Sequence, residues 1–299
     1  MMRSSGIMRG GGFIKKNISG WLLMLLPVIL FTFFVWEPLL ESVRLSLYRA
    51  QGVRLVEFVG LRNYIAVTQH PDFMPALRNT FSYTFWSLII GFLVPIVLAI
   101  IINEVRYGKS FIKTCVYIPN VVPGIAIALL WTFIFRPGDT GTLNIILGKF
   151  GMDPLPWLTR STWTIPLIVV TMTWKSAGAT TLLYIAGLQG IDPELYEASI
   201  IDGANIFKRV RYITIPCIFN LARVMLILQI ISVFQILFEP LVMTNGGPNN
   251  ASISIMLLMY NMAFRRINYP QATAVSVLIS LILVVITIIY FKVVKKQDM

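Results

Sequence analysis

Few side chains of this sequence could do chemistry, and the informative ones are polar groups inside long apolar runs. Four occur near the end of one run at near-helical spacing: Gln229, Ser232, Gln235 and Glu239. At about 100° per residue they lie within about a third of a helix circumference. Lys175 is the only charge in another run. Such amide, hydroxyl and carboxylate groups can bind the hydroxyls of an uncharged sugar, with an aromatic side chain such as Tyr184 as a platform.

Polar side chains are costly inside a membrane, and they usually face a bundle interior or a wet cavity. A central lysine costs about 2.5–3.5 kcal/mol on insertion scales, so Lys175 needs water or a partner such as Glu239. Small polar groups also join neighbouring helices by hydrogen bonds. For the glutamines and Lys175 the sequence leaves both roles open, solute pathway and helix packing. The ionisable Glu239 favours a pathway or outer-gate contact.

The side-chain inventory speaks against catalysis in this chain. It holds one histidine, His70, and neither a nucleophile–base set nor a metal cluster is recognisable. The phosphate-binding pattern G-x4-G-K-[ST] does not occur, because Gly148-Lys149 is followed by Phe150. We therefore predict no catalytic residue, no metal site and no bound cofactor.

The overall composition requires lipid as the main solvent. Of 299 residues, 57% are hydrophobic and only 13% are charged, yet the net charge is +12. That charged share is about half the usual share of a soluble domain. An ordinary soluble enzyme, a disordered chain and a disulfide scaffold are thereby excluded.

The apolar runs predict an all-α polytopic membrane protein with six transmembrane helices. About 20 apolar residues are needed to cross the hydrocarbon core. The runs that meet this length cover residues 17–36, 79–103, 114–135, 161–191, 219–242 and 267–291. The run 253–264 is too short to cross and follows the helix-breaking stretch 244–250, so it predicts an interfacial or re-entrant helix packed against protein.

Lysine placement predicts the orientation. Six spans put both termini on one side, and that side collects eight of the ten lysines, whereas several arginines fall in the first outer loop. The bias toward positive charge on the inside then places both termini in the cytoplasm. Residues 1–20 form a cytoplasmic segment, 21–296 the membrane domain and 297–299 a cytoplasmic tail. Most of the basic charge thus faces membrane lipid, and no nucleic-acid partner is needed.

The loop 189–218, between the fourth and fifth spans, has explicit local signals. Asp192 is a good N-cap and Pro193 suits the first helical position. Gly203 can take the left-handed conformation that ends a helix. A helix over Pro193–Asp202 is predicted, then a second helical piece over 207–212, with Pro216 marking the start of the fifth span. Taken alone, these local features favour a long amphipathic connector over any specific function.

The spacing within this loop resembles the EAA loop of ABC importer permeases, whose pattern is E-A-A-x3-G-x9-I-x-L-P. Here Ser199 replaces the second alanine and Ile215 replaces leucine. The residues that match the pattern are Glu197, Ala198, Ser199, Gly203, Ile213, Ile215 and Pro216. The Asp202-Gly203-Ala204 sequence and the outer segment 244–248 are similar to the carbohydrate-importer branch, nearest to the first membrane subunit of maltose- and glycerol-phosphate-type systems.

This resemblance implies a type I importer permease in a bacterial cell (inner) membrane. Its loop 189–218 would carry a coupling helix that docks on a cytoplasmic ATPase subunit, with Glu197 as a polar anchor and Gly203 as the turn. The implied partners are a second homologous permease, two ATPase subunits that bind ATP and Mg, and an extracytoplasmic solute-binding protein. The implied cargo is a sugar or oligosaccharide. The alternatives are the same machine for another solute, such as glycerol phosphate or a polyamine, and a stand-alone secondary transporter, for which no clear inverted repeat is seen.

Overall fold

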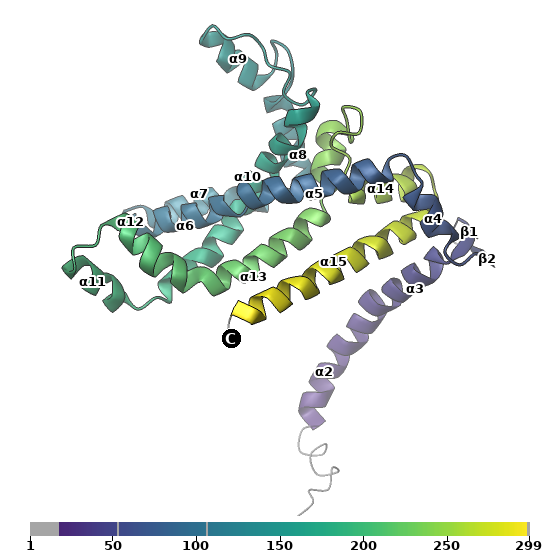
Figure 1. Ribbon diagram of the computed structural model, residues 1–299, viewed down its shortest axis with the longest axis horizontal. Helices are drawn as coiled ribbons and strands as arrows, with labels where there is room; N and C mark the ends of the chain where they lie inside the picture. Colours follow the sequence, from purple (N-terminus) through teal and green to yellow (C-terminus); the bar gives the residue numbers. More distant parts are fainter. Residues whose placement is uncertain (1–17, 53, 106, 298–299) are drawn as a thin grey trace, which may run out of the picture.

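The computed structural model describes residues 18–52, 54–105 and 107–297, and it is almost entirely helical (Figure 1). The first half contains α2 (Ile18–Phe31), the π-helical turn η1 (Thr32–Trp36), α3 (Glu37–Ser46), β1 (Tyr48–Gln51), β2 (Arg54–Phe58), α4 (Arg62–Thr68), α5 (Phe73–Ile89), α6 (Leu93–Glu104), α7 (Lys109–Val121), α8 (Gly124–Ile134) and α9 (Thr142–Lys149). The second half contains α10 (Ser161–Gln189), α11 (Pro193–Ile201), α12 (Ile206–Arg209), η2 (Val210–Thr214), α13 (Ile215–Phe234), η3 (Pro240–Thr244), α14 (Ile255–Tyr260), η4 (Asn261–Arg265) and α15 (Tyr269–Gln297). The predicted segment 1–20 lies outside the described residues except for 18–20, and the predicted tail 297–299 except for Gln297.

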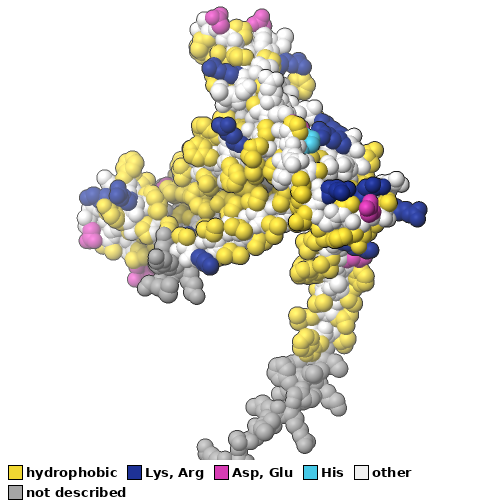
Figure 2. Space-filling model, turned by 45° about the vertical axis from the view of Figure 1, so that its right-hand side comes forward, with side chains coloured by type: hydrophobic (Ala, Val, Ile, Leu, Met, Phe, Trp, Pro, Cys, Tyr) yellow, Lys and Arg dark blue, Asp and Glu magenta, His cyan; other side chains and the backbone are white. Residues whose placement is uncertain are grey.

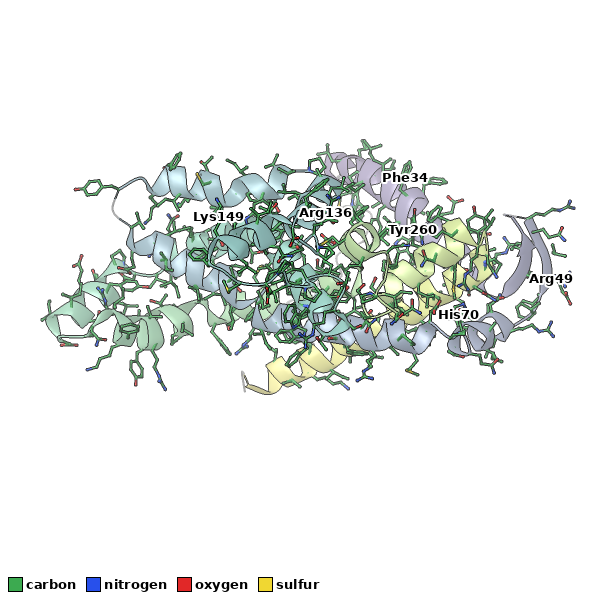
Figure 3. All side chains as sticks on the ribbon, turned by 90° about the horizontal axis from the view of Figure 1, so that it is seen from above. Phe34, Arg49, His70, Arg136, Lys149 and Tyr260 are labelled. Carbon is green, nitrogen blue, oxygen red and sulfur yellow. The ribbon has the colours of Figure 1, made fainter. Side chains whose placement is uncertain are left out.

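The long helices form a bundle with distinct ends. In Figure 1, α11 and α12 lie at one end, and α4 with the β1–β2 hairpin lies at the other. Arg49 and His70 belong to this hairpin end, as the view from above shows (Figure 3). Apolar side chains cover the middle of the bundle, while charged side chains gather mainly at its ends (Figure 2). This distribution is typical of a protein that spans a lipid bilayer.

The helix α10 is the centre of the packing. It contacts α5, α6, α7, α8 and α13. One buried cluster joins it to α5, α8 and α13 through residues such as Tyr83, Ile168 and Val233. A second joins it to α6 and α13, and a third lies between α5, α14 and α15. The antiparallel β1–β2 hairpin, with Tyr48 opposite Phe58, is the one departure from the predicted all-α fold among the described residues.

The number of spanning helices differs from the prediction. Among the described residues, four helices are long and apolar enough to cross a membrane: Gly20–Ser46, Phe73–Glu104, Ile206–Phe234 and Tyr269–Val294. A bent helix pair would make five. The 29-residue helix α10 has the length, but it carries Lys175 and six threonines and is not among them. Length and hydropathy therefore do not confirm the count of six.

The third predicted span, 114–135, is broken in the middle. The helices Lys109–Val121 and Gly124–Ile134 meet at 98°. Val122 is extended, with ψ 136°, and Pro123 follows it. Proline disfavours a helical conformation at the residue before it and has no N–H to donate, so the helix must stop there. The bend places Gly124 beside α10, where an added Cβ would lie 3.0 Å from Lys175 Nζ.

The fifth predicted span, 219–242, is displaced along the chain. The continuous helical stretch runs over Ile206–Phe234, and Gln235 is the residue that ends it. Beyond that point Ser254 Oγ donates to the carbonyl of Ile236 at 2.7 Å. A side chain from a distant segment thus satisfies a backbone group that a longer helix would have paired. The spacing had predicted one helix for Gln229, Ser232 and Glu239. In the structure Glu239 lies beyond the end of the helix that carries the other two.

The predicted short helix at 253–264 is confirmed as a segment packed against protein. It comprises α14 and η4, and Ile255, Leu257, Leu258 and Met262 are buried. Ser254 caps its start by accepting from the N–H of Leu257 at 3.0 Å. By contrast, no residue in the most apolar stretch of the first span is buried, and α2 stands clear of the bundle in Figure 1.

The close approach of α10 to α7 generates a stability prediction. A Cβ added at Gly178 would lie 2.1 Å from the carbonyl oxygen of Val116. We expect Gly178→Ala to force these helices apart and to destabilise the protein by about 1–3 kcal/mol, the range for overpacking. The measurement is the thermal unfolding midpoint of the purified membrane protein.

A matched control is Gly148→Ala in α9, where an added Cβ meets nothing within 4 Å. Because alanine favours a helix over glycine by about 1 kcal/mol, this variant should keep or raise the midpoint. Equal midpoints for the two variants would contradict tight α7–α10 packing.

Candidate functional site

A cavity of about 410 Å³ opens between α10, α13 and the stretch that follows α13. It brings together five of the six residues predicted from the sequence to line a solute pathway. These are Lys175, Gln229, Ser232, Gln235 and Glu239. Segments that are far apart in the chain thus present their rare polar groups to one space.

Helical spacing explains the wall that α10 provides. Lys175, Ser176, Thr180 and Leu183 follow one another at steps that keep them on one side of a helix, and all line the cavity. Ser176 and Thr180 were missed by the sequence reasoning. Their spacing relative to Lys175 was the available signal, but hydroxyls are common inside spans and do not stand out.

The two charged side chains of the cavity do not form a direct pair. Glu239 is 8% exposed and Lys175 is partly buried, and both line the same space. In the described part of the chain, no ion pair within 4.0 Å involves Lys175, so the predicted Lys175–Glu239 contact is not formed. The cavity separates the two charges, because they approach it from different segments. A polar solute could therefore reach both.

Gln229 takes the helix-packing role that the sequence had left open. Its Nε2 donates to the Oγ of Ser87, a buried residue of α5, at 2.5 Å. A Cβ added at Gly91 would lie 2.8 Å from this nitrogen, so the glycine leaves the amide its room. The side-chain oxygen of Gln229 is left for the cavity. By comparison, the side chains of Ser232 and Gln235 make no hydrogen bond within the described residues.

Tyr184 lies outside this cavity, contrary to the prediction. It is 0% exposed and belongs to a buried cluster with Ala99, Ile185 and Ile218. Tyr184 follows Lys175 by nine positions, and at about 100° per residue this puts the two on opposite sides of α10. The aromatic residue that lines the cavity is Phe238, which lies directly before Glu239 and is 48% exposed.

The loop 189–218 has the predicted helix and turn. The carboxylate of Asp192 accepts from the N–H of Glu194 at 3.0 Å, so it caps α11. Gly203 has φ +75°, the left-handed conformation that the helix end requires. The N–H of Ala204 donates to the carbonyl of Ser199 at 2.9 Å, and that of Asp202 to the carbonyl of Ala198 at 3.0 Å. The α11 helix ends at Ile201, one residue before the predicted end.

Pro216 lies in the first turn of α13, which begins at Ile215, as predicted. The helical stretch nevertheless starts earlier, because α12 and η2 continue into α13 from Ile206. The π-helical turn η2 ends at Thr214, two positions before the proline. Such a turn lets the helix continue although proline has no N–H to donate. A hydrogen bond of 3.0 Å between Tyr196 Oη and Thr214 Oγ1 fastens α11 to this turn.

Most residues of α11 and α12 are exposed. Glu197 and Asp202 are exposed, and so are large apolar side chains beside them. Ile200 is 57% exposed, Ile201 86% and Phe207 81%. A projecting surface that exposes apolar and acidic groups together has the composition of a docking surface.

Comparison with known proteins identifies the family. The model for the family described as "Binding-protein-dependent transport system inner membrane component" matches residues 91–297. The chain belongs to this family. The match covers both the cavity and the loop 189–218, and it establishes a transport component rather than an enzyme.

Similar proteins extend the comparison over nearly the whole chain. The trehalose/maltose transport system permease protein MalF of Thermococcus litoralis is 34% identical over 273 residues, 91% of this chain and 92% of that protein. The lactose transport system permease protein LacF of Rhizobium radiobacter is 31% identical, over 92% of this chain and 93% of that protein. These matches cover more of the chain than the family model, which matches residues 91–297.

A solved structure with the same fold is that of a bacterial ABC transporter involved in the import of the acidic polysaccharide alginate. Its matching chain has a TM-score of 0.84 and 26% identity, and the match covers 95% of this chain and 98% of that one. A second structure, of the alginate ABC transporter in complex with an alginate pentasaccharide-bound periplasmic protein, matches with a TM-score of 0.83. The predicted ABC importer permease fold is thereby confirmed.

Proposed function

We propose that this chain is the membrane-spanning permease subunit of an ATP-driven ABC importer for a sugar or oligosaccharide. The observation that carries the proposal is the cavity lined by Lys175, Gln229 and Glu239, hereafter the central cavity, in a chain of this family. The relatives support the class of cargo, because similar proteins belong to trehalose/maltose, lactose and arabinooligosaccharide systems. The alginate transporter of the same fold also handles a saccharide.

The chemistry of the cavity suits a saccharide passing through. Sugar hydroxyls both donate and accept hydrogen bonds, and the cavity offers an ammonium group, two amides, hydroxyls and a carboxylate. Phe238 provides an apolar face for a ring. The polar groups are few and apolar side chains such as Met225 and Leu228 lie between them. Contacts of this kind orient a solute without holding it tightly, as a pathway requires.

The projection of α11 and α12 supports the proposed partners. We assign its exposed surface to a cytoplasmic ATPase subunit, which binds ATP and Mg and pulls on Glu197, Ala198, Ser199, Asp202, Gly203 and Ala204. Two such subunits would serve this chain and a second, homologous permease. The solute-binding protein would dock at the opposite end, near the hairpin. The related alginate transporter, solved in complex with its periplasmic protein, supports this last partner.

The proposed orientation places α11 and α12 on the cytoplasmic side of a bacterial cell membrane. The turn between α6 and α7 lies at the same end of the bundle in Figure 1. Lys109 and Lys113 follow that turn, and Lys208 belongs to α12. Positive side chains at this end agree with the inside-positive rule and with both termini in the cytoplasm.

The test of the proposed function uses the chain with its genomic neighbours. The co-expressed proteins are purified together in nanodiscs, and ATP hydrolysis is measured while a candidate solute-binding protein is added with different oligosaccharides. We expect ATPase subunits to be retained and hydrolysis to rise with one oligosaccharide class. Failure to retain any ATPase subunit would favour a carrier that works alone.

A substitution in the coupling turn tests the docking role. Gly203 has φ +75° and an added Cβ would meet nothing within 4 Å, so Gly203→Asp strains the turn and adds charge without a steric clash. We expect membrane insertion to persist while solute uptake falls to background. Gly151→Asp is the matched control, because Gly151 has φ +74° and is equally unobstructed but lies after α9. Normal uptake by the Gly203 variant would show that this loop does not couple transport to ATP.

Removal of the cavity's positive charge tests the pathway. Lys175→Met keeps the length of the side chain but removes a charged donor, whose hydrogen bond to a solute contributes about 1.5–3 kcal/mol. We expect uptake to fall by about tenfold or more, since about 1.4 kcal/mol corresponds to tenfold. Lys149→Met in exposed α9 should leave uptake unchanged. Wild-type uptake by Lys175→Met would remove this residue from the pathway.

A further inference from the structure

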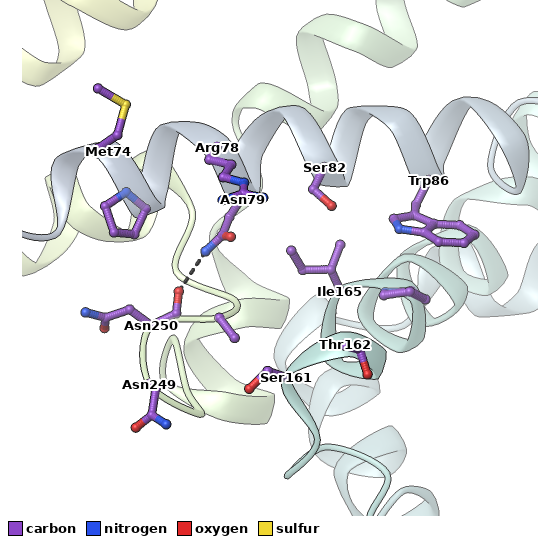
Figure 4. Close-up of a pocket in the computed structure, with 13 residues that line it drawn as sticks. Met74, Arg78, Asn79, Ser82, Trp86, Ser161, Thr162, Ile165, Asn249 and Asn250 are labelled. Atoms are coloured by element: carbon purple, nitrogen blue, oxygen red, sulfur yellow. Dashed lines mark hydrogen bonds between the residues drawn. The ribbon is translucent and has the colours of Figure 1, made fainter.

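A second cavity, of about 590 Å³, lies between α5, the start of α10 and the loop 249–251 (Figure 4). It is separate from the central cavity and shares no lining residue with it. Buried apolar residues of α10, Ile168 and Val169, lie between the parts of the helix that line the two cavities. On the proposed orientation this pocket belongs to the outer side of the membrane.

One face of α5 forms the long wall of this outer pocket. Arg78, Ser82 and Trp86 recur at every fourth residue and all line it (Figure 4). At about 1.5 Å of rise per residue they span about 12 Å. The guanidinium group therefore lies toward the outer end of the wall and the indole toward its deeper end.

Hydrogen bonds to α5 hold the opposite wall in place. Asn79 Nδ2 donates to the carbonyl oxygens of Asn250, at 2.7 Å, and of Ile253, at 3.0 Å. Asn250 Nδ2 in turn donates to Asp72 Oδ1 at 2.7 Å. Asn249 and Asn250 have φ +49° and +59°, a conformation that asparagine tolerates better than most residues. The loop is thus a preformed wall.

Several polar groups of the pocket are left unused by the fold. Within the described residues, the side chains of Arg78, Ser82, Ser161, Thr162 and Asn249 make no hydrogen bond or ion pair. All five line the pocket, and all but the half-buried Ser82 are exposed to solvent. Asn79 and Asn250, by comparison, are committed to the loop. An indole, hydroxyls, an amide and a guanidinium group around a cavity of this size can bind a small polar ligand.

The charge of the pocket is one-sided. Of the described residues that line it, Arg78 is the only charged one, and none carries a carboxylate. The acidic residue that reaches the loop, Asp72, is already engaged by Asn250 and by Arg266, whose NH2 group lies 3.7 Å from its carboxylate. The first turn of α10 also has no acidic residue. The pocket therefore favours a ligand with a negative charge.

We propose that this outer pocket binds an oligosaccharide that carries carboxylate groups, such as an oligouronate, with Arg78 as the partner of one carboxylate and Trp86 beneath another ring of the same chain. The proposal rests on the proposed saccharide transport and names a class of sugar for it. A neutral sugar presents hydroxyl donors that need a strong acceptor, and the central cavity has one in Glu239. The outer pocket instead has a fork of guanidinium donors, which suits a carboxylate.

The test is a binding measurement on the whole complex. The wild-type complex in phosphatidylcholine nanodiscs, without ATP and without a solute-binding protein, is titrated with trigalacturonate and with maltotriose. We expect trigalacturonate to bind at least tenfold more tightly. Arg78→Gln should abolish the difference, and Arg78→Lys should retain part of it, because lysine keeps the charge but loses the fork. The control Arg62→Gln alters an exposed outer arginine that does not line the pocket and should behave as wild type.

Three results would overturn the proposal: equal affinity for the two trisaccharides, a preference that survives in Arg78→Gln, or a loss of trigalacturonate binding when phosphatidylglycerol replaces half of the lipid. The last result would assign the pocket to a lipid phosphate. Because the titration needs neither ATP nor uptake, its failure is distinct from failure of the proposed transport function. That function is judged by ATPase retention and by oligosaccharide-stimulated hydrolysis.

Discussion

The constraint on which this structure depends is that lipid offers no hydrogen bonds to the backbone. Helices satisfy it by pairing each N–H and C=O internally, so a break inside the membrane is tolerated only where protein or a cavity receives the freed groups. The two main breaks obey this rule. Gly124, after the bend at Pro123, comes to lie beside Lys175, and the stretch after Phe234 lines the central cavity. Both breaks therefore adjoin the proposed pathway.

The same constraint makes polar side chains informative. Lys175, Gln229, Ser232, Gln235 and Glu239 stand out because each is rare in an apolar run, and the structure gathers them at one cavity. The rarity of a polar residue does not reveal, however, which side of a helix faces the cavity. Tyr184 was predicted to be an aromatic platform for a sugar, but it lies on the side of α10 away from the cavity, in a buried cluster. Gln229 reaches Ser87 of α5, a partner 142 positions away that no local pattern could indicate.

The loop 189–218 was largely predictable because its conformation is decided locally. An aspartate before a proline starts a helix, and a glycine ends it, through contacts between residues only a few positions apart. The α11 helix and the conformation of Gly203 follow from these rules. The continuation of the helix through η2 into α13 was not predictable locally, because the Tyr196–Thr214 hydrogen bond that anchors this turn joins two separate segments.

The sequence by itself determined the solvent, the family and the chemical inventory of this protein. Those follow from composition, from motif spacing and from which polar residues are present at all. Only the tertiary structure decided where α7 and α8 bend apart, where the fifth span ends and which polar groups share a cavity. The physical reason is that these features depend on partners distant in the chain, such as Ser254 for the carbonyl of Ile236. The outer pocket is of the same kind, because α5, α10 and the loop 249–251 form it only when they are folded together.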